Sequence, residues 1–415
     1  MESDIPARRR GKALNRRRLL AGGASATAAF FAAHATGNFG LLREAAAQHV
    51  LPPASTTAFR AMSGHEFDDE PFDPVAVADG SAGWFPSVYG EGDELGTLNE
   101  VTPQKTLEAL QLIKNNKNKP PKTYNMGEVM EPGMPAFGDR FYIQDRVGPD
   151  EPFGENLLIG MEEVIETTYQ IATQIDNLNH IGVIDKWYNG FTTEQMITNP
   201  DNPHGSNFLG QHLVDPFVTR GILLDVLSVK IEQGESDALG EPVDGKPILA
   251  NSYRITIEDL EAAMQFGGID DIRPGDMVTI RTGWTHLFDP HDTERKERYV
   301  ASEPGPYLRE ARWLAQFRPA VVGSDTWAWE VLPAPEPWSE TQFYPCHQEL
   351  MTRHGIRIGE AFVSEELAED GVYEFVFFYT GQRPRWATAA NVAPGAIGQR
   401  MDRPADPASG RGRGR

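Results

Sequence analysis

The stretch from Thr168 to Gly182, TYQIATQIDNLNHIG, carries amide, acidic and imidazole side chains at a spacing that suits a metal-dependent site. Gln170, Gln174 and Asp176 share one face if this segment is a strand, because side chains alternate between the two faces. His180 follows the aspartate by four residues. A carboxylate binds hard divalent cations, and an imidazole exchanges protons near neutral pH.

A second group of candidate residues lies in YPCHQELMTRHGIRIGE, where Glu360 follows His347 by thirteen residues. Together with Asp176 they form an Asp, His and Glu set of the kind that holds divalent metals. Gln174 and Gln170 then supply neutral carbonyl oxygens, and His180 is free to act as general acid or base. Spacing alone leaves a second interpretation open, in which these are ordinary polar residues at strand ends.

The elements that must position these residues are predicted from hydrophobic periodicity and capping signals. Helices are expected at 102–115, 256–266, 307–317 and 347–355, where Thr102 and Thr256 are capping residues. Strands are expected at 122–130, 141–144, 163–176, 220–229, 273–284, 319–327 and 371–381. Because the first half is rich in strands and the second half alternates, we predict a mixed α/β fold in one domain.

The composition of the 415-residue chain excludes several functional classes. A formal net charge of −22 repels phosphate backbones, so nucleic-acid binding is not expected. Beyond residue 50 there is no apolar run long enough for a membrane span. The single cysteine, Cys346, excludes an internal disulfide, and we expect it to be a buried inert thiol rather than a nucleophile.

The N-terminus has the layout of an export signal. Arg16, Arg17 and Arg18 precede two leucines and a run of small residues with Ala-x-Ala sites, which resembles a twin-arginine signal. We therefore expect export by the twin-arginine machinery to the periplasm or the exterior. The predicted organisation is a signal peptide at 1–47, an extended lead-in at 48–85, a catalytic domain at 86–398 and a disordered tail at 399–415.

These motifs resemble the cyclase family, the metal-dependent hydrolases that include kynurenine formamidase and isatin hydrolase. The family signature is His-x-Gly-Thr-His-x-Asp-x-Pro-x-His, and Thr173, Asp176 and His180 match it, whereas Gln170 and Gln174 replace its two earlier histidines. Further similar segments follow in the same order from Gly90 to Pro394. They are EPGMPAFGD, RGILLDV, RPGDMVTIRTGW, VVGSDTW and HQELMTRHGIRIGEAFVSEELAEDGVYEFVFF.

The resemblance implies a mixed α/β domain with a central barrel-like β-structure, found in dimers or higher oligomers. It implies that Asp176, His347 and Glu360 are metal ligands and that His180 is the proton shuttle. Gln170 and Gln174 then shift the site toward manganese or a weakly bound zinc, because an amide oxygen is a harder and weaker donor than imidazole. The reaction implied is hydrolysis of an amide, cyclic amide or lactone by metal-activated water.

Aromatic residues near predicted strand ends indicate a small, flat substrate. The candidates for the lining of its pocket are Phe137, Trp187, Tyr188, Trp284, Trp327 and Trp329. His286 and Asp325 are further candidates for a role in the site. Two alternatives stay open: a metal-dependent lyase or cyclase using the same residues, and a periplasmic binding protein that has lost catalysis.

Overall fold

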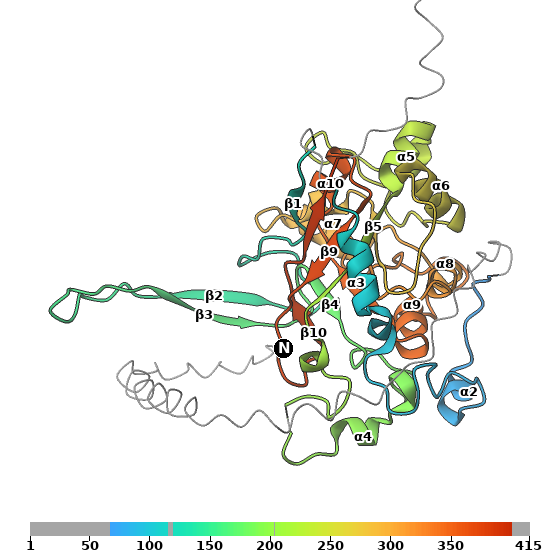
Figure 1. Ribbon diagram of the computed structural model, residues 1–415, viewed down its shortest axis with the longest axis horizontal. Helices are drawn as coiled ribbons and strands as arrows, with labels where there is room; N and C mark the ends of the chain where they lie inside the picture. Colours follow the sequence, from blue (N-terminus) through green and yellow to red (C-terminus); the bar gives the residue numbers. More distant parts are fainter. Residues whose placement is uncertain (1–66, 115–118, 203, 401–415) are drawn as a thin grey trace, which may run out of the picture. The chain divides into compact units, whose positions relative to one another are not determined.

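The computed structural model describes residues 67–114, 119–202 and 204–400. This part of the chain is built around a curled, half-barrel sheet of nine strands with helices packed against it (Figure 1). The predicted fold class, mixed α/β with a central barrel-like β-structure, is confirmed. The predicted signal peptide, residues 48–66 of the lead-in and the tail from residue 401 lie outside the described residues.

The sheet has the strand order β1-β11-β9-β5-β6-β7-β8-β4-β10. Its centre, β5 to β8, is parallel, whereas both flanks are antiparallel. The strands are β1 (Lys122–Asn125), β4 (Gln174–Asp176), β5 (Phe217–Asp225), β6 (Met277–Arg281), β7 (Val321–Ser324), β8 (Arg357–Glu360), β9 (Glu374–Tyr379), β10 (Ala389–Asn391) and β11 (Gly395–Gly398). Parallel strands end at the same edge of a sheet, which is where sites form in open α/β folds.

Helices bury the central strands. β6, β7 and β8 are buried at every residue, as expected of parallel strands covered on both faces. α3 packs against β5 and β9, and α6 packs against β5 and α5. The α-helices are α2 (Pro74–Asp79), α3 (Pro103–Leu110), α4 (Thr193–Ile197), α5 (Val226–Gln233), α6 (Ile257–Gly267), α7 (Thr293–Ala301), α8 (Leu308–Ala315), α9 (Pro345–His347) and α10 (Glu365–Glu369). Short turns of other helix types are η2 (Gly96–Glu100), η3 (Tyr188–Gly190), η4 (Gln211–Leu213), η5 (Ser236–Ala238), η6 (Trp284–Leu287) and η7 (Gln348–Arg353), the last a π-helix.

The predicted caps are confirmed. The Thr102 side chain accepts a hydrogen bond from the backbone of Lys105 at the start of α3. Thr256 and Asp259 form a reciprocal capping box at the start of α6. The strand expected at 220–229 is too long, because the Asp225 carboxylate caps α5 and ends β5 there.

The long strand expected at 163–176 is wrong. β3 (Glu162–Thr167) pairs with β2 (Tyr142–Val147) in a separate two-stranded sheet, and β4 begins only at Gln174. Between them the chain bends, with Ala172 at a positive φ of 53°. Asn391 holds the bend by donating to the carbonyl oxygens of Tyr169 and Ile171. Gln170 therefore does not share the strand face of Gln174.

The hairpin of β2 and β3 extends away from the nine-stranded sheet (Figure 1). Its large apolar side chains are exposed; they are Phe141, Ile143, Phe153, Leu157, Leu158, Ile159, Met161, Val164 and Ile165. A two-stranded hairpin is marginally stable by itself, so this surface is suited to contact with another molecule.

The lead-in expected to be extended contains a helix in its described part. α2 begins after Asp73, whose side chain caps it, and has proline at its first position. None of the helices in the described ranges has the length and apolar character needed to cross a membrane.

Candidate metal centre

The pairing of β4 with β8 brings two predicted site segments together. Gln174 lies directly opposite Glu360, and Asp176 follows Gln174 by two residues on the same face of β4. His347 ends α9, which continues directly into η7 ahead of β8. The ligand atoms of Asp176, His347 and Glu360 all lie within 4.8 Å of one another, and all three residues are buried.

The residues of this group fit a divalent cation. Asp176 Oδ1 and Gln174 Oε1 are buried and have no hydrogen-bond partner among the described residues. The amide nitrogen of Gln174 donates to Glu360 Oε2. An unpaired buried acceptor costs about 1–3 kcal/mol, and a cation removes that cost. One imidazole, two carboxylates and an amide oxygen form a donor set that suits manganese or zinc.

Burial and mutual contact shift the ionisation of this group. Burial raises the pKa of Asp176 to about 6, with Glu360 adding to the increase and His180 opposing it. Burial acts to lower the pKa of His347, but hydrogen bonds with Glu330 and Glu360 outweigh it and raise that pKa to about 10. Such shifts, caused by burial and specific charged partners, are typical of functional sites.

Glu330 holds His347, a role that the sequence analysis missed. Glu330 Oε1 lies 2.6 Å from His347 Nδ1 and also accepts the backbone N–H of His347 at 3.2 Å. Its other oxygen accepts the backbone N–H of Cys346 at 3.2 Å. His347 Nε2 is thereby directed toward Asp176 and Glu360, and it lies 3.3 Å from Glu360 Oε1. Asp176, His347 and Glu360 are called the metal group below. A carboxylate that orients a ligating histidine in this way is a common feature of metal sites. The only signal in the sequence was an acidic residue within the apolar stretch WAWEVL.

His180 lies beside the group, and Gln170 orients it. His180 Nε2 is 3.5 Å from Asp176 Oδ2, and its Nδ1 is 3.3 Å from the amide nitrogen of Gln170. The same amide nitrogen donates to Thr388 Oγ1 at 2.7 Å. Gln170 thus contacts the imidazole rather than the three grouped ligands. Burial lowers the pKa of His180, while the charge of Asp176 opposes that effect.

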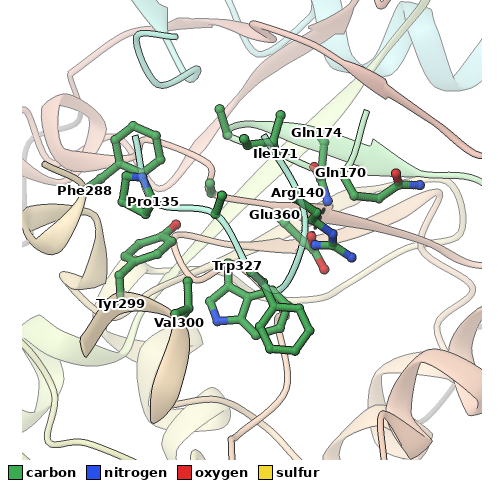
Figure 2. A pocket seen from close by; sticks show the side chains of 14 residues that line it. Pro135, Arg140, Gln170, Ile171, Gln174, Phe288, Tyr299, Val300, Trp327 and Glu360 are labelled. Carbon is green, nitrogen blue, oxygen red and sulfur yellow. Dashed lines mark hydrogen bonds between the residues drawn. The ribbon is translucent and has the colours of Figure 1, made fainter. Parts of the chain in front are cut away.

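A small pocket with about 290 Å³ of empty space, including its open mouth, adjoins the metal group. Figure 2 shows Arg140, Gln170, Gln174 and Glu360 on one side of it and Phe288, Tyr299 and Val300 on the other. The rings of Phe137 and Trp327, two of the predicted lining residues, stack with their centroids 4.2 Å apart and form an apolar wall. The sequence analysis did not find Arg140 or Tyr299, because neither lies in a recognisable motif.

The other predicted aromatic residues do not line this pocket. Trp284 is fully buried in the same apolar cluster as Trp327 and Tyr299, and it donates its indole N–H to the carbonyl of Tyr299. The Tyr188 hydroxyl donates to Asp93, and Trp187 donates to Thr193, so both are used within the loop around η3. Trp329 is also a core residue. Their positions near strand ends did not determine which way their side chains point.

Three further candidates have structural contacts. Asp325 follows β7 and accepts the backbone N–H groups of Thr282 and Gly283, which fixes the turn after β6. His286 Nε2 lies 3.4 Å from Glu365 Oε2. Cys346 is completely buried, and burial raises the pKa of its thiol, which is the expected behaviour of an inert thiol.

Comparison with known proteins places the chain in a family. A model of the "Putative cyclase" family matches residues 106–331, more than half of the chain. No curated protein matches the chain. Among solved structures, the crystal structure of a novel cyclase has a TM-score of 0.62 and 25% identity, covering 74% of this chain and 95% of that one.

Two further solved structures are less similar. Isatin hydrolase A from Ralstonia solanacearum has a TM-score of 0.47 at 15% identity, covering 71% of this chain and 98% of its own. A predicted metal-dependent hydrolase from Bacillus stearothermophilus has a TM-score of 0.40 at 18% identity, with 67% and 98% covered. On the match of the family model, the chain belongs to the cyclase family.

Proposed function

We propose that this protein is a metal-dependent hydrolase that cleaves an amide, cyclic amide or lactone bond of a small aromatic substrate. The observation that carries the proposal is the buried group of Asp176, His347 and Glu360, with Asp176 Oδ1 and Gln174 Oε1 unpaired beside it. A carboxylate oxygen without a donor, buried next to a second carboxylate, is unfavourable unless a cation is present. Membership in the cyclase family supports the same conclusion.

The roles of the residues follow from their positions. Asp176, His347 and Glu360 hold a divalent ion, manganese or zinc, and Gln174 offers its amide oxygen as a further donor. When bound, such an ion lowers the pKa of water and polarises a carbonyl group. Glu330 keeps His347 Nε2 directed inward by holding Nδ1.

His180 is the proposed acid and base. The Gln170 amide contacts His180 Nδ1, and Nε2 is the nitrogen that faces Asp176. With the amide oxygen of Gln170 turned to accept from Nδ1–H, Nε2 is the free nitrogen, placed to take a proton from the attacking water and to deliver it to the leaving nitrogen or oxygen. Gln170 also lines the pocket, so a bound substrate would lie next to the side chain that orients His180.

The location and assembly of the protein are part of the proposal. The arginine-rich N-terminus supports export by the twin-arginine machinery to the periplasm or the exterior. The exposed apolar side chains of the β2–β3 hairpin support a homo-oligomer, because association would cover a surface that is otherwise in contact with water.

Metal analysis tests the proposal most directly. We expect at least one divalent ion per chain in protein purified without chelators, and loss of most of it in Asp176→Asn and Glu360→Gln. Glu366→Gln is the matched control, because Glu366 is exposed and lies outside the group. Wild-type protein that binds no metal even after Mn²⁺ or Zn²⁺ is supplied would refute the proposal. Incorporation of ¹⁸O from labelled water into the product separates hydrolysis from a lyase or cyclase reaction.

A further inference from the structure

Arg140 presents an unpaired positive charge at the wall of the pocket. Within the described ranges, no carboxylate lies within 4.0 Å of its guanidinium, and its side chain makes no hydrogen bond. The guanidinium carbon is 5.8 Å from the ring centroids of both Phe137 and Trp327, which positions it over the apolar wall. Figure 2 shows it beside Gln170 and Glu360. A half-buried cation in a chain with a net charge of −22 would ordinarily have an acidic partner.

The charge of Arg140 acts at the metal group. Burial is the main cause of the raised pKa of Asp176, and Arg140 is among the charges that counteract it. For His180, burial is again the largest influence, and Arg140 adds to the lowering of the pKa. Arg140 lines the same pocket as Gln174 and Glu360, so an anion bound by Arg140 lies beside the proposed metal ligands.

Tyr299 offers a second donor on the opposite side of the pocket. Its side chain is 2% exposed, and its hydroxyl has no hydrogen-bond partner among the described residues. Figure 2 shows this hydroxyl directed toward the middle of the lining residues. Burial and the surrounding carboxylates raise the pKa of Tyr299, so the hydroxyl keeps its proton and donates. A buried donor without an acceptor is costly, and a ligand oxygen in this pocket would remove that cost.

We propose that the substrate is an aromatic compound with a carboxylate adjacent to the scissile acyl group. Arg140 binds this carboxylate, and Tyr299 donates a hydrogen bond to another oxygen of the same molecule. The aromatic ring of the substrate packs on the wall formed by Phe137 and Trp327. This inference rests on the proposed hydrolase function for the scissile bond, but the binding of the anion is independent of it.

Three aryl esters test where the substrate's carboxylate must lie relative to the scissile bond: phenyl acetate, 2-acetoxybenzoate and 4-acetoxybenzoate. The ratio of wild-type kcat/KM to that of Arg140→Gln is compared across them, because this ratio cancels their different intrinsic reactivities. We expect the ratio for 2-acetoxybenzoate to exceed the ratio for phenyl acetate by about tenfold or more, because a charge-assisted hydrogen bond has about this effect. The ratio for 2-acetoxybenzoate should also exceed the ratio for 4-acetoxybenzoate. Arg146→Gln, an exposed arginine of the hairpin, is the matched control. Equal ratios for all three esters would overturn the proposal.

Calorimetric titration tests the anion site at Arg140 independently of the proposed hydrolase function. Salicylate and phenol are titrated into metal-containing wild type, Arg140→Gln and Arg146→Gln. We expect the preference for salicylate over phenol to fall about tenfold in Arg140→Gln only. If no ester is hydrolysed and this loss is seen, the anion site stands on binding alone, and the metal and ¹⁸O experiments decide the hydrolase proposal. If esters are hydrolysed and salicylate binding does not depend on Arg140, the anion site is refuted.

Tyr299→Phe tests the second contact. The substitution removes one oxygen atom and leaves the ring in place against Phe288. We expect the affinity for salicylate to fall by about two- to tenfold, the range of one neutral hydrogen bond. An unchanged affinity in a folded variant would remove Tyr299 from the proposed site.

Discussion

Glu330→Gln tests whether a residue that only orients a metal ligand affects metal binding. Glu330 contacts the proposed ligand His347 and is not one of the three grouped residues Asp176, His347 and Glu360. The carboxylate receives three N–H groups: the ring Nδ1 and backbone N–H of His347 on one oxygen, and the backbone N–H of Cys346 on the other. A glutamine has one acceptor oxygen and one donor nitrogen in the same space.

The cost follows from these contacts. In its better orientation the glutamine oxygen keeps both bonds to His347, and its nitrogen faces the N–H of Cys346, donor against donor. One buried N–H is then unpaired, which lowers the free energy of unfolding by about 1–3 kcal/mol. The imidazole also loses its charged partner, and loss of such a partner weakens metal binding by about 10- to 100-fold, or about 1.4–2.7 kcal/mol.

Both quantities are measurable on one preparation. Competition with a chelating dye gives the affinity for Zn²⁺ and Mn²⁺, and urea unfolding of the metal-free protein gives its stability. Glu340→Gln, an exposed neighbour in sequence, is the control. If Glu330→Gln folds and binds metal within about twofold of wild type, the inference that Glu330 supports His347 is wrong.

Two further predictions concern other parts of the molecule. Burial acts to raise the pKa of Glu365, but hydrogen bonds from His286 and Arg281 lower it to about 2. A carboxyl with a lowered folded-state pKa adds stability that is fully present above its unfolded pKa near 4.5 and is lost as the pH falls through about 2. Urea unfolding between pH 6 and 3 should therefore show a loss of about 2 kcal/mol that is absent in Glu365→Gln. Val164→Lys places a charge among the apolar side chains of the hairpin, and light scattering should show a smaller assembly than the wild type.

Each of these has a clear contrary outcome. Equal pH dependence in wild type and Glu365→Gln would show that Glu365 is not the group responsible. A wild type that is monomeric, or a Val164→Lys variant with the wild-type mass, would show that the hairpin does not mediate assembly. Gln144→Lys, at an exposed position of β2, adds the same single positive charge and controls for it.

Local signals in the sequence predicted most elements correctly. The capping residues Thr102 and Thr256 and the buried strands near 277 and 321 depend on contacts within a few residues, and these are visible in the pattern of side chains. The prediction failed where a segment changes direction without a proline or glycine. The bend at Ala172 is one such place, because it depends on Asn391, more than 200 residues away.

The sequence by itself determined the chemical types available to the site: an aspartate, a histidine and a glutamate with metal-binding capacity, and a second histidine suited to proton transfer. Only the tertiary structure decided their arrangement. The register of β4 against β8 places Gln174 opposite Glu360, and the bend before β4 turns Gln170 to His180. Glu330 and Arg140 gain their importance from neighbours distant in the chain, since hydrogen bonds and charges act through space and carry no periodic signature in the sequence.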